Sequence, residues 1–238
     1  MNIGIILIAT GKYINFFDQV YKSYEKFFLP NYPKHYFLLT DCTDRKFNNN
    51  ISTYKIKRLG WPGDTLYRYH RFMTIKNDIE KSSVNVLYYT DVDMKVVSEV
   101  GDEFLPEIGK PLVAVAHPGF FYRNKMGTPE NRKESTAYID PSEDRPHYIC
   151  GGIQGGLVNE YLNASKTIKQ QIDDDNKNNI TAIWNDESHW NRYMVSNLNK
   201  FKFLPANYCH PEKTRRFGLG KLTPKILALD KNHEYFRS

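Results

Sequence analysis

The sequence predicts an α/β protein built on an open sheet with helices around it. Short apolar runs rich in β-branched and aromatic residues alternate with longer segments that have helical periodicity. Several of these apolar runs end in polar or acidic residues, as the strands of such sheets do where they meet a ligand. A chain of 238 residues can bury a core of its own, so we expect a single domain.

The first part of the chain has the clearest alternation. Its apolar runs are too short for helices and end at polar residues, whereas its helical segments carry apolar residues on one face. The expected elements, in order, are a strand over 2–9, a loop over 10–13, a helix over 15–28, strands over 35–40 and 51–57, a helix over 64–79 and a strand over 84–90.

The pattern loosens after residue 93. We expect a strand over 112–116, a long polar loop over 122–146, a helix over 157–172, a helix that Asn185 caps and that runs through Val195, and a basic tail over 213–238. No internal repeat or low-complexity linker separates these elements, which agrees with one domain.

Four glycines stand together at Gly151, Gly152, Gly155 and Gly156. Such a cluster marks backbone that approaches another group closely or adopts positive φ. Its spacing matches neither the dinucleotide-binding fingerprint nor the Walker loop. Taken alone, the cluster favours a tight turn that leads into the following helix.

Composition restricts the class of ligand. Lys and Arg number 33 and Asp and Glu 27, a net charge of +6, which suits an anionic or phosphate-rich ligand or peripheral contact with an acidic membrane surface. Without a dense basic segment, nucleic acid is not an expected partner. Three distant cysteines indicate no disulfide framework, and the opening apolar run is too short to span a membrane. We therefore expect a cytoplasmic protein without a transmembrane segment.

Asp91 and Asp93 follow the apolar run of residues 84–90 directly. Carboxylates at the end of a buried strand are hard oxygen donors for Mg²⁺ or Mn²⁺, which can neutralise a diphosphate. An isolated Asp-x-Asp can also begin a solvated turn, so other parts of the chain have to decide between the two interpretations.

A second pair of acids, Asp186 and Glu187, lies in the first turn of a predicted helix, after Trp184. Acids at this position interact favourably with the helix dipole. They can also be mounted there to act on a sugar, since a carboxylate that faces an anomeric carbon can be a nucleophile or can stabilise an oxocarbenium ion. His117, which follows a strand, is more often structural than a metal ligand.

Taken together, these motifs resemble glycosyltransferase family 6, which includes the blood-group A and B transferases, the α-1,3-galactosyltransferase and shorter microbial relatives. The resemblance covers residues 5–237. It is carried by segments 91–94, 117–120, 135–139, 150–156, 184–189 and 231–233, which read DVDM, HPGF, STAYI, CGGIQGG, WNDESH and KNH.

The resemblance implies a GT-A-type nucleotide-sugar transferase fold with an open mixed sheet flanked by helices. It implies a retaining α-1,3-glycosyltransferase that moves GalNAc or Gal from UDP to O3 of a β-galactoside, which can carry fucose. The cofactor would be Mn²⁺, with Mg²⁺ as the alternative, held by Asp91 and Asp93. Residues 1–93 would form the UDP- and metal-binding half, and residues 94–238 the acceptor-binding half with a C-terminal lid.

The resemblance also assigns roles by position. Glu187 would be the catalytic carboxylate, and it would line the acceptor site with His117 and Trp184. Tyr13 would stack on uracil, Asp186 would bind the donor sugar, and Lys231 and Arg237 would close over the diphosphate. The remaining donor-binding positions would be Ala9, Thr10, Arg68, Asp91, Val92, Asp93, Cys150, Gly151 and Gly152.

The chain departs from the family pattern in places that affect the acceptor more than the donor. Asn185 replaces the usual histidine of Trp-His-Asp-Glu, Asn131 interrupts Glu-Arg-Arg, and Cys209-His210 replaces a Trp-Asp pair. We expect the basic residues of the tail to have no acidic partner until a diphosphate binds. A sugar-binding module without catalysis and a metal-dependent phosphotransferase are the alternatives. The first would need these carboxylates lost, and the second a phosphate-binding lysine loop that the chain lacks.

Overall fold

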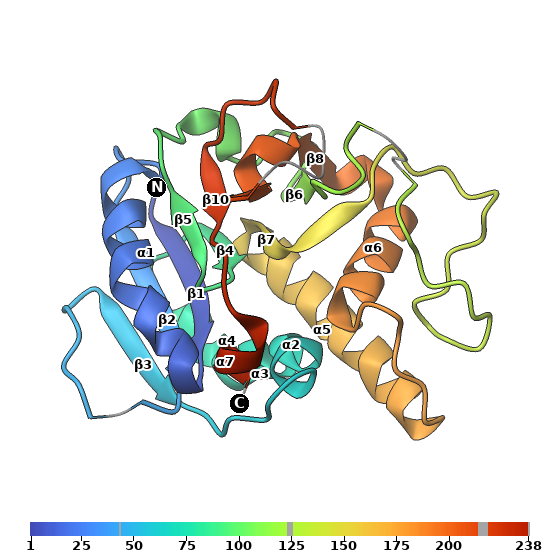
Figure 1. Cartoon of the computed structure of the whole chain (residues 1–238), viewed down its shortest axis with the longest axis horizontal. Helices are drawn as coiled ribbons and strands as arrows, with labels where there is room; N and C mark the ends of the chain where they lie inside the picture. The colour runs from blue at the N-terminus through green and yellow to red at the C-terminus, as the bar shows by residue number, and fades with distance from the viewer. Residues whose placement is uncertain (43, 123–125, 214–218, 238) are drawn as a thin grey trace.

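A computed structural model describes residues 1–42, 44–122, 126–213 and 219–237. Within them, a mixed sheet of seven strands forms the centre of the molecule, in the order β3-β2-β1-β4-β7-β6-β8 (Figure 1). The strands are β1 (Ile3–Ala9), β2 (Lys34–Thr40), β3 (Ile51–Lys55), β4 (Val86–Thr90), β6 (Leu112–Ala116), β7 (Ile149–Leu157) and β8 (Phe201–Leu204).

The two halves of the sheet differ in strand direction. Strand β1 runs parallel to both β2 and β4, and β2 runs parallel to β3, so the carboxyl ends of these strands meet at one edge. Strand β7 is antiparallel to β4 and β6, and β6 is parallel to β8. The mixed sheet with its flanking helices confirms the expected fold class.

Helices cover both faces of the sheet (Figure 1). They are α1 (Ile14–Phe27), α2 (Gly63–Leu66), α3 (Arg68–Thr74), α4 (Lys76–Lys81), α5 (Val158–Lys177), α6 (Asp186–Ser196) and α7 (His233–Arg237). One core contains α1 with Ile3 and Ile5 of β1, and the other contains α3 to α6 with Ile6 and Ile8. Because successive strand residues enter opposite cores, β1 is apolar along its whole length.

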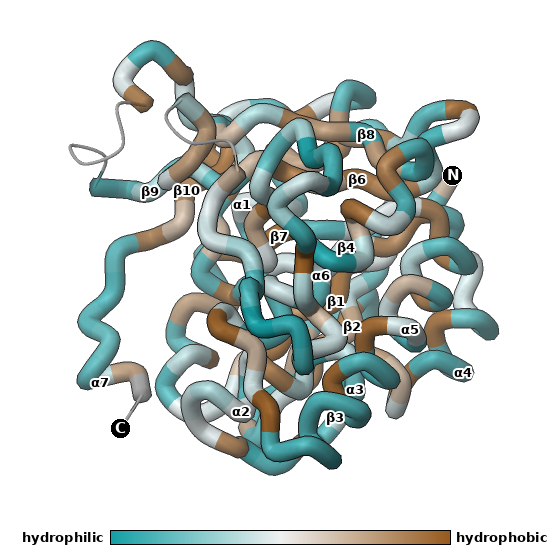
Figure 2. Tube along the Cα trace, turned by 90° about the vertical axis from the view of Figure 1, so that its right-hand side faces the viewer, coloured by the Kyte–Doolittle hydropathy of each residue, from teal (hydrophilic) through white to brown (hydrophobic). Residues whose placement is uncertain are grey.

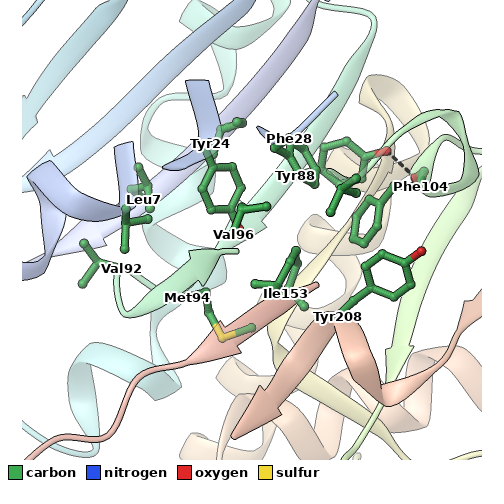
Figure 3. Packing of buried hydrophobic residues seen from close by; sticks show 14 of the residues in the cluster. Leu7, Tyr24, Phe28, Tyr88, Val92, Met94, Val96, Phe104, Ile153 and Tyr208 are labelled. Carbon is green, nitrogen blue, oxygen red and sulfur yellow. Dashed lines mark hydrogen bonds between the residues drawn. The ribbon is translucent and has the colours of Figure 1, made fainter. Parts of the chain in front are cut away.

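A second, small sheet packs near α1. It consists of β5 (Met94–Val96), β10 (Ile226–Ala228) and β9 (His210–Pro211). Met94 and Val96 lie in the core beside Tyr24 of α1 (Figure 3). The Tyr24 hydroxyl donates a hydrogen bond to Thr90 Oγ1 at 2.8 Å, and the Tyr88 hydroxyl donates one to the Phe104 carbonyl at 2.7 Å. These bonds hold the end of β4 just before Asp91.

The glycine cluster corrects the sequence-based interpretation. It does not form a turn into a helix but lies inside β7. A Cβ at Gly155 would stand 2.3 Å from the Leu87 carbonyl oxygen, and one at Gly156 would stand 2.2 Å from the Pro111 carbonyl oxygen. The glycines are needed because β7 passes very close to backbone on both of its sides.

Other boundaries differ more modestly. The single helix expected over 64–79 is divided into α2, α3 and α4, and the helix expected over 157–172 extends to Lys177. Asn185 stands at the N-cap position of α6 but makes no capping side-chain bond, and its φ is +52°. Neither β8 nor the small sheet was predicted. Among the described residues, no helix has the length and apolar character required to cross a membrane.

The close approach of β7 to β4 gives a test of stability. Gly155→Ala should lower the free energy of unfolding by about 1–3 kcal/mol, because its Cβ would overlap the Leu87 carbonyl oxygen. Gly220→Ala is the matched control, since a Cβ there meets nothing within 4 Å. Urea unfolding followed by circular dichroism measures both, and equal midpoints for the two variants would contradict the packing argument.

Candidate active site

Polar residues gather at the edge where the parallel strands end. Thr10 follows β1, Asp41 follows β2 and Asp91 follows β4. The backbone N–H of Gly11 donates to Asp41 Oδ1 at 2.9 Å, and Thr10 Oγ1 donates to Asp64 Oδ2 at 3.0 Å. This edge is the usual ligand-binding edge of an α/β sheet.

In the described part of the chain, two cavities at this edge share Asp91, Asp93 and Lys231. The first, of about 280 Å³, is lined by aromatic and basic side chains together with acidic and small ones; the aromatic and basic side chains include Tyr13, Arg58, Trp61, Arg68, Tyr89 and Phe236. The second, of about 290 Å³, is lined by Met94, His117, Cys150, Gly152, Glu187 and Cys209, among others. A ligand that extends from one cavity into the other has to pass the two aspartates.

The two aspartates have different surroundings. Asp91 is about one-third exposed, with 36% of its side chain accessible, and it accepts a hydrogen bond of 2.5 Å from the Tyr89 hydroxyl. Arg68 Nη2 lies 3.6 Å from Asp91 Oδ1. Asp93 is buried, and burial raises the pKa of its carboxyl, an effect that Lys231 opposes and the charge of Asp91 reinforces. This place in the protein therefore favours a positive charge.

The aspartates fit a divalent cation that also binds the substrate. Their carboxylate oxygens are the hard donors that Mg²⁺ and Mn²⁺ prefer. Among the residues with described positions, no three His, Cys, Asp or Glu side chains converge to hold an ion. Asp91 and Asp93 are the residues that would hold such a cation, which would supply positive charge beside a bound phosphate.

The C-terminal tail corrects a second expectation. Lys231 already has an acidic partner, because its Nζ pairs with Asp93 Oδ2, and it lies 5.3 Å from the centre of the Tyr13 ring. Beyond it, α7 packs the Phe236 ring 5.3 Å from that of Tyr13. Figure 2 shows the stretch between β10 and α7 as a largely hydrophilic segment at the edge of the molecule. A buried carboxylate is costly without a counter-ion, which explains the pairing. The side chain of Arg237 lies outside the described residues.

Arg68, at the start of α3, is the buried cation of the site. Its Nε lies 2.6 Å from Asp186 Oδ2, and its Nη1 donates to the Gly151 carbonyl at 2.5 Å. Its guanidinium stands 4.5 Å from the centre of the Tyr89 ring. Arg68 thus connects α3, the end of β4, β7 and the start of α6.

Asp186 is fully buried and lines neither of the two cavities. Burial raises the pKa of its carboxyl to about 7, the charges of Asp91 and Glu187 add to this effect, and Arg68 opposes it. Asp186 therefore lies behind the cavities, against Arg68, and its direct contact with a donor sugar stays a prediction.

Glu187 lies on the wall of the second cavity, in the first turn of α6. Its Oε2 accepts a hydrogen bond of 2.8 Å from the Gly151 N–H. The buried phenol of Tyr148 lies beside it, and burial together with the charge of Glu187 raises the pKa of Tyr148. His117 also faces this carboxylate, and burial lowers the pKa of its imidazole, so a neutral ring stands next to Glu187.

The glycines of β7 allow this approach. A Cβ at Gly151 would lie 3.3 Å from Glu187 Cβ, and one at Gly152 would lie 3.0 Å from Asp91 Oδ2. Side chains at these two positions would push against both carboxylates. The glycines therefore allow the backbone of β7 to lie close to both Asp91 and Glu187.

Other predicted residues are spread along the edge. Val92 lines the first cavity, Ala9 is buried at the end of β1, and Cys150 lines the second cavity beside Cys209. Trp184 lines neither cavity and is 48% exposed. Its indole N–H donates a 2.7 Å hydrogen bond to Thr128 Oγ1.

Sequence reasoning missed residues that hold the site. The Tyr89 hydroxyl donates a hydrogen bond to Asp91, and its ring lies under the Arg68 guanidinium. Its position two residues before Asp91 could have indicated that it contacts this aspartate. Tyr148 lies two residues before the glycine-bearing Cys150-Gly151-Gly152 segment, but nothing in its own neighbourhood indicates that it reaches Glu187.

Comparison with known proteins shows the family of the chain. The family model described as Glycosyltransferase family 6 matches residues 1–238. The chain is 30% identical over 237 residues to the O-antigen biosynthesis glycosyltransferase WbnI of Escherichia coli. The aligned region covers 98% of this chain and 97% of that protein. It is 31% identical over 248 residues to the human Globoside alpha-1,3-N-acetylgalactosaminyltransferase 1. This aligned region covers 100% of the present chain and 69% of the human protein.

A third relative is the Histo-blood group ABO system transferase 1 of Rattus norvegicus, which is 28% identical over 246 residues, with 99% of this chain and 68% of that protein covered. Enzymes of this kind use a nucleotide-sugar donor and a glycan acceptor. Because the family model spans the whole chain, and the relatives align along nearly all of it, this protein belongs to glycosyltransferase family 6 and is a glycosyltransferase.

Proposed function

We propose that the protein transfers GalNAc, or Gal, from its UDP donor to O3 of a β-galactoside with retention, forming an α-1,3 linkage. The observation that carries this proposal is the junction of the two cavities. Asp91 and Asp93 lie where they meet, and Glu187 lines the second cavity. A nucleoside diphosphate in the first cavity would thus direct its sugar toward Glu187.

The first cavity suits a uridine diphosphate, and it belongs mainly to the proposed donor half, residues 1–93. Tyr13 offers an aromatic face for uracil beside the loop after Ala9, and Arg58 and Arg68 supply positive charge for the phosphates. Nothing in this arrangement needs a phosphate-binding lysine loop.

Asp91 and Asp93 would hold Mn²⁺, or Mg²⁺, against the diphosphate. When bound, the cation neutralises charge that develops on the UDP leaving group. Lys231 lies within reach of the same place, so its ammonium can leave Asp93 for a phosphate oxygen once Asp93 has another counter-ion. This exchange would make the tail the C-terminal lid.

Glu187 would stand beneath the anomeric carbon. Retention needs a covalent glycosyl-enzyme or a same-face displacement through an ion-pair-like transition state, and either requires negative charge under the sugar ring. The Gly151 N–H orients the carboxylate, and Arg68 holds Asp186 behind it. His117 and Trp184 would form the acceptor side in the second half of the chain.

The donor sugar is proposed from Gly152. A Cβ here would lie 3.0 Å from Asp91 Oδ2, so the absence of a side chain keeps the wall beside Asp91 clear for a donor sugar with a 2-acetamido group. The name of the human relative describes it as an N-acetylgalactosaminyltransferase, which supports the same choice. The acceptor is proposed only as a β-galactoside, with or without fucose.

The cation proposal predicts metal binding that depends on the aspartates. In the presence of UDP, the protein should bind Mn²⁺, and Asp93→Asn should weaken binding at least ~10-fold, because a charged ligand is lost. Asp230→Asn, which removes a carboxylate next to Lys231 in the C-terminal tail but from neither cavity, is the control. Electron paramagnetic resonance of free Mn²⁺ measures binding, and EDTA-treated enzyme with full activity would reject metal dependence.

The catalytic proposal predicts a selective loss of turnover. Glu187→Gln keeps the size of the side chain but removes its charge, so kcat should fall at least ~10²-fold, roughly 2.7 kcal/mol of transition-state stabilisation, while donor KM changes little. Glu160→Gln on α5, which breaks a surface pair with Lys200, is the matched control. A near-native kcat would remove Glu187 from the mechanism, and a β-linked product would exclude retention.

Donor preference gives another prediction. The native enzyme should show a higher kcat/KM for UDP-GalNAc than for UDP-Gal with several β-galactosides, because Gly152 leaves space for the acetamido group. Gly152→Ala should reduce activity with both donors, since its Cβ would lie 3.0 Å from Asp91 Oδ2. A consistent preference for UDP-Gal in the native enzyme would overturn the assignment.

A further inference from the structure

Two segments that contact Glu187 or its neighbour Tyr148 have no helix or strand of their own. They are residues 127–132 of the long loop and residues 181–184 before α6. Exposed segments of this kind keep one conformation only where side chains fasten them. Three described hydrogen bonds join the two segments, and on the first segment they come from Thr128, Glu130 and Arg132.

Glu130 is a buried carboxylate, only 1% exposed, that accepts four hydrogen bonds. Its Oε1 accepts from the Arg132 backbone N–H at 3.0 Å and from Arg132 Nε at 2.9 Å. Its Oε2 accepts from Arg132 Nη2 at 2.7 Å and from the Ile183 N–H at 2.7 Å. Arg132 Nη2 also donates to the Thr181 carbonyl at 2.5 Å. One carboxylate and one guanidinium thus join the two segments.

The joined segments reach the catalytic side of the molecule. Trp184 Nε1 donates to Thr128 Oγ1 at 2.7 Å, and the Glu187 N–H donates to the Trp184 carbonyl at 3.1 Å. Gly127 packs directly on the Tyr148 ring, which lies next to Glu187. The position of the loop and that of the first turn of α6 are therefore linked through Thr128 and Trp184, and Glu130 holds the backbone of Ile183, the residue before Trp184.

Two large apolar side chains are held in solvent by this arrangement. Ile183 is 52% exposed and Trp184 is 48% exposed. Adjacent exposed apolar residues are suited to a partner with an apolar face, and the indole of Trp184 is suited to stack on the face of a sugar ring. Their presentation depends on the backbone of residues 181–184, which Glu130 and Arg132 anchor.

We propose that Glu130 is a positioning residue that fixes Trp184 for the glycan acceptor, an inference that rests on the proposed function. It touches neither reacting group. Its carboxylate holds the Ile183 N–H, and thereby the adjacent indole, in the geometry that receives the acceptor sugar. No residue of either segment lines the first cavity, so donor binding there does not depend on this contact.

The electrostatic environment of Glu130 keeps its carboxylate ionised and hydrogen-bonded. Hydrogen bonds from Arg132, together with backbone N–H groups, lower the pKa of Glu130 to about 2. A lowered folded-state pKa adds stability at every pH above the unfolded value near 4.3, and this contribution is lost as pH falls toward 2. The contact therefore stays ionised throughout the neutral range and is not a pH switch there.

The decisive variant is Glu130→Gln, with Glu134→Gln as the control on the same loop, where the side chain is exposed. We expect acceptor KM to rise about tenfold in Glu130→Gln, with kcat and donor KM within twofold of native, because glutamine has one acceptor oxygen in place of two and no charge, so it cannot satisfy Arg132 and the Ile183 N–H together. Glu134→Gln should match the native enzyme. Unchanged acceptor KM in Glu130→Gln, or an equal loss in both variants, would overturn the proposal.

A second readout does not require transfer. The chain has three tryptophans, so 5-fluorotryptophan labelling should give a ¹⁹F NMR spectrum in which Trp184→Phe identifies the Trp184 signal. That signal should shift or broaden in Glu130→Gln while the signal of buried Trp190 stays in place. An unchanged Trp184 signal contradicts the positioning role even if the proposed transfer reaction is wrong.

Should Glu130→Gln fail to fold, Thr128→Val tests the same link from an exposed position. It removes the acceptor of the Trp184 indole N–H without emptying a buried site. Acceptor KM should rise in the same direction, and the Trp184 signal should move. Native values for both measurements would reject the link.

Discussion

The buried guanidinium of Arg68 is the interaction on which the rest of the site depends. Asp91, Asp186 and Glu187 bring negative charge together at the edge of the sheet, and burial would make this arrangement unfavourable without a fixed cation. Arg68 lies 2.6 Å from Asp186 and 3.6 Å from Asp91, and it also binds the Gly151 carbonyl. Losing one partner of such a buried pair typically costs about 3–5 kcal/mol, so this residue serves folding as well as the site.

Arg68 also explains how acids of different function can coexist. Asp186 lies against Arg68 and lines neither of the two cavities, whereas Glu187, one residue later, lines the second cavity and accepts a hydrogen bond from the Gly151 N–H. Adjacent positions at the start of a helix project in different directions. The pair therefore places Asp186 against Arg68 and leaves Glu187 on the wall of the second cavity.

A second pair of opposite charges lies on the wall that the two cavities share. Asp93 is buried and pairs with Lys231, which lies 138 residues later in the sequence. The ion pair is formed by a tail that also packs Phe236 on Tyr13. Occupation of the first cavity and the position of the tail are thus physically coupled, because both involve the Tyr13 ring and the Asp93 carboxylate.

The sequence by itself determined the features that depend on short-range pattern. Apolar periodicity predicted β1, α1, β2 and β4, because burial on one or both faces leaves a regular local signal. Asp91 and Asp93 were found because they end such a strand, and Glu187 because it opens a helix. Arg68 and Lys231 came only from resemblance to a family, since an isolated basic residue in a helix or a tail carries no pattern of its own.

Only the tertiary structure decided how distant groups meet. The local sequence around the glycines of β7 predicted a turn. In the structure these glycines allow β7 to pack closely between its neighbouring strands β4 and β6. The small sheet has strands of two or three residues, too short for any periodicity. Lys231 meets Asp93, Tyr148 reaches Glu187 and Glu130 joins two loops because long-range packing removes these groups from water. A buried charge must then find its partner in space, wherever that partner lies along the chain.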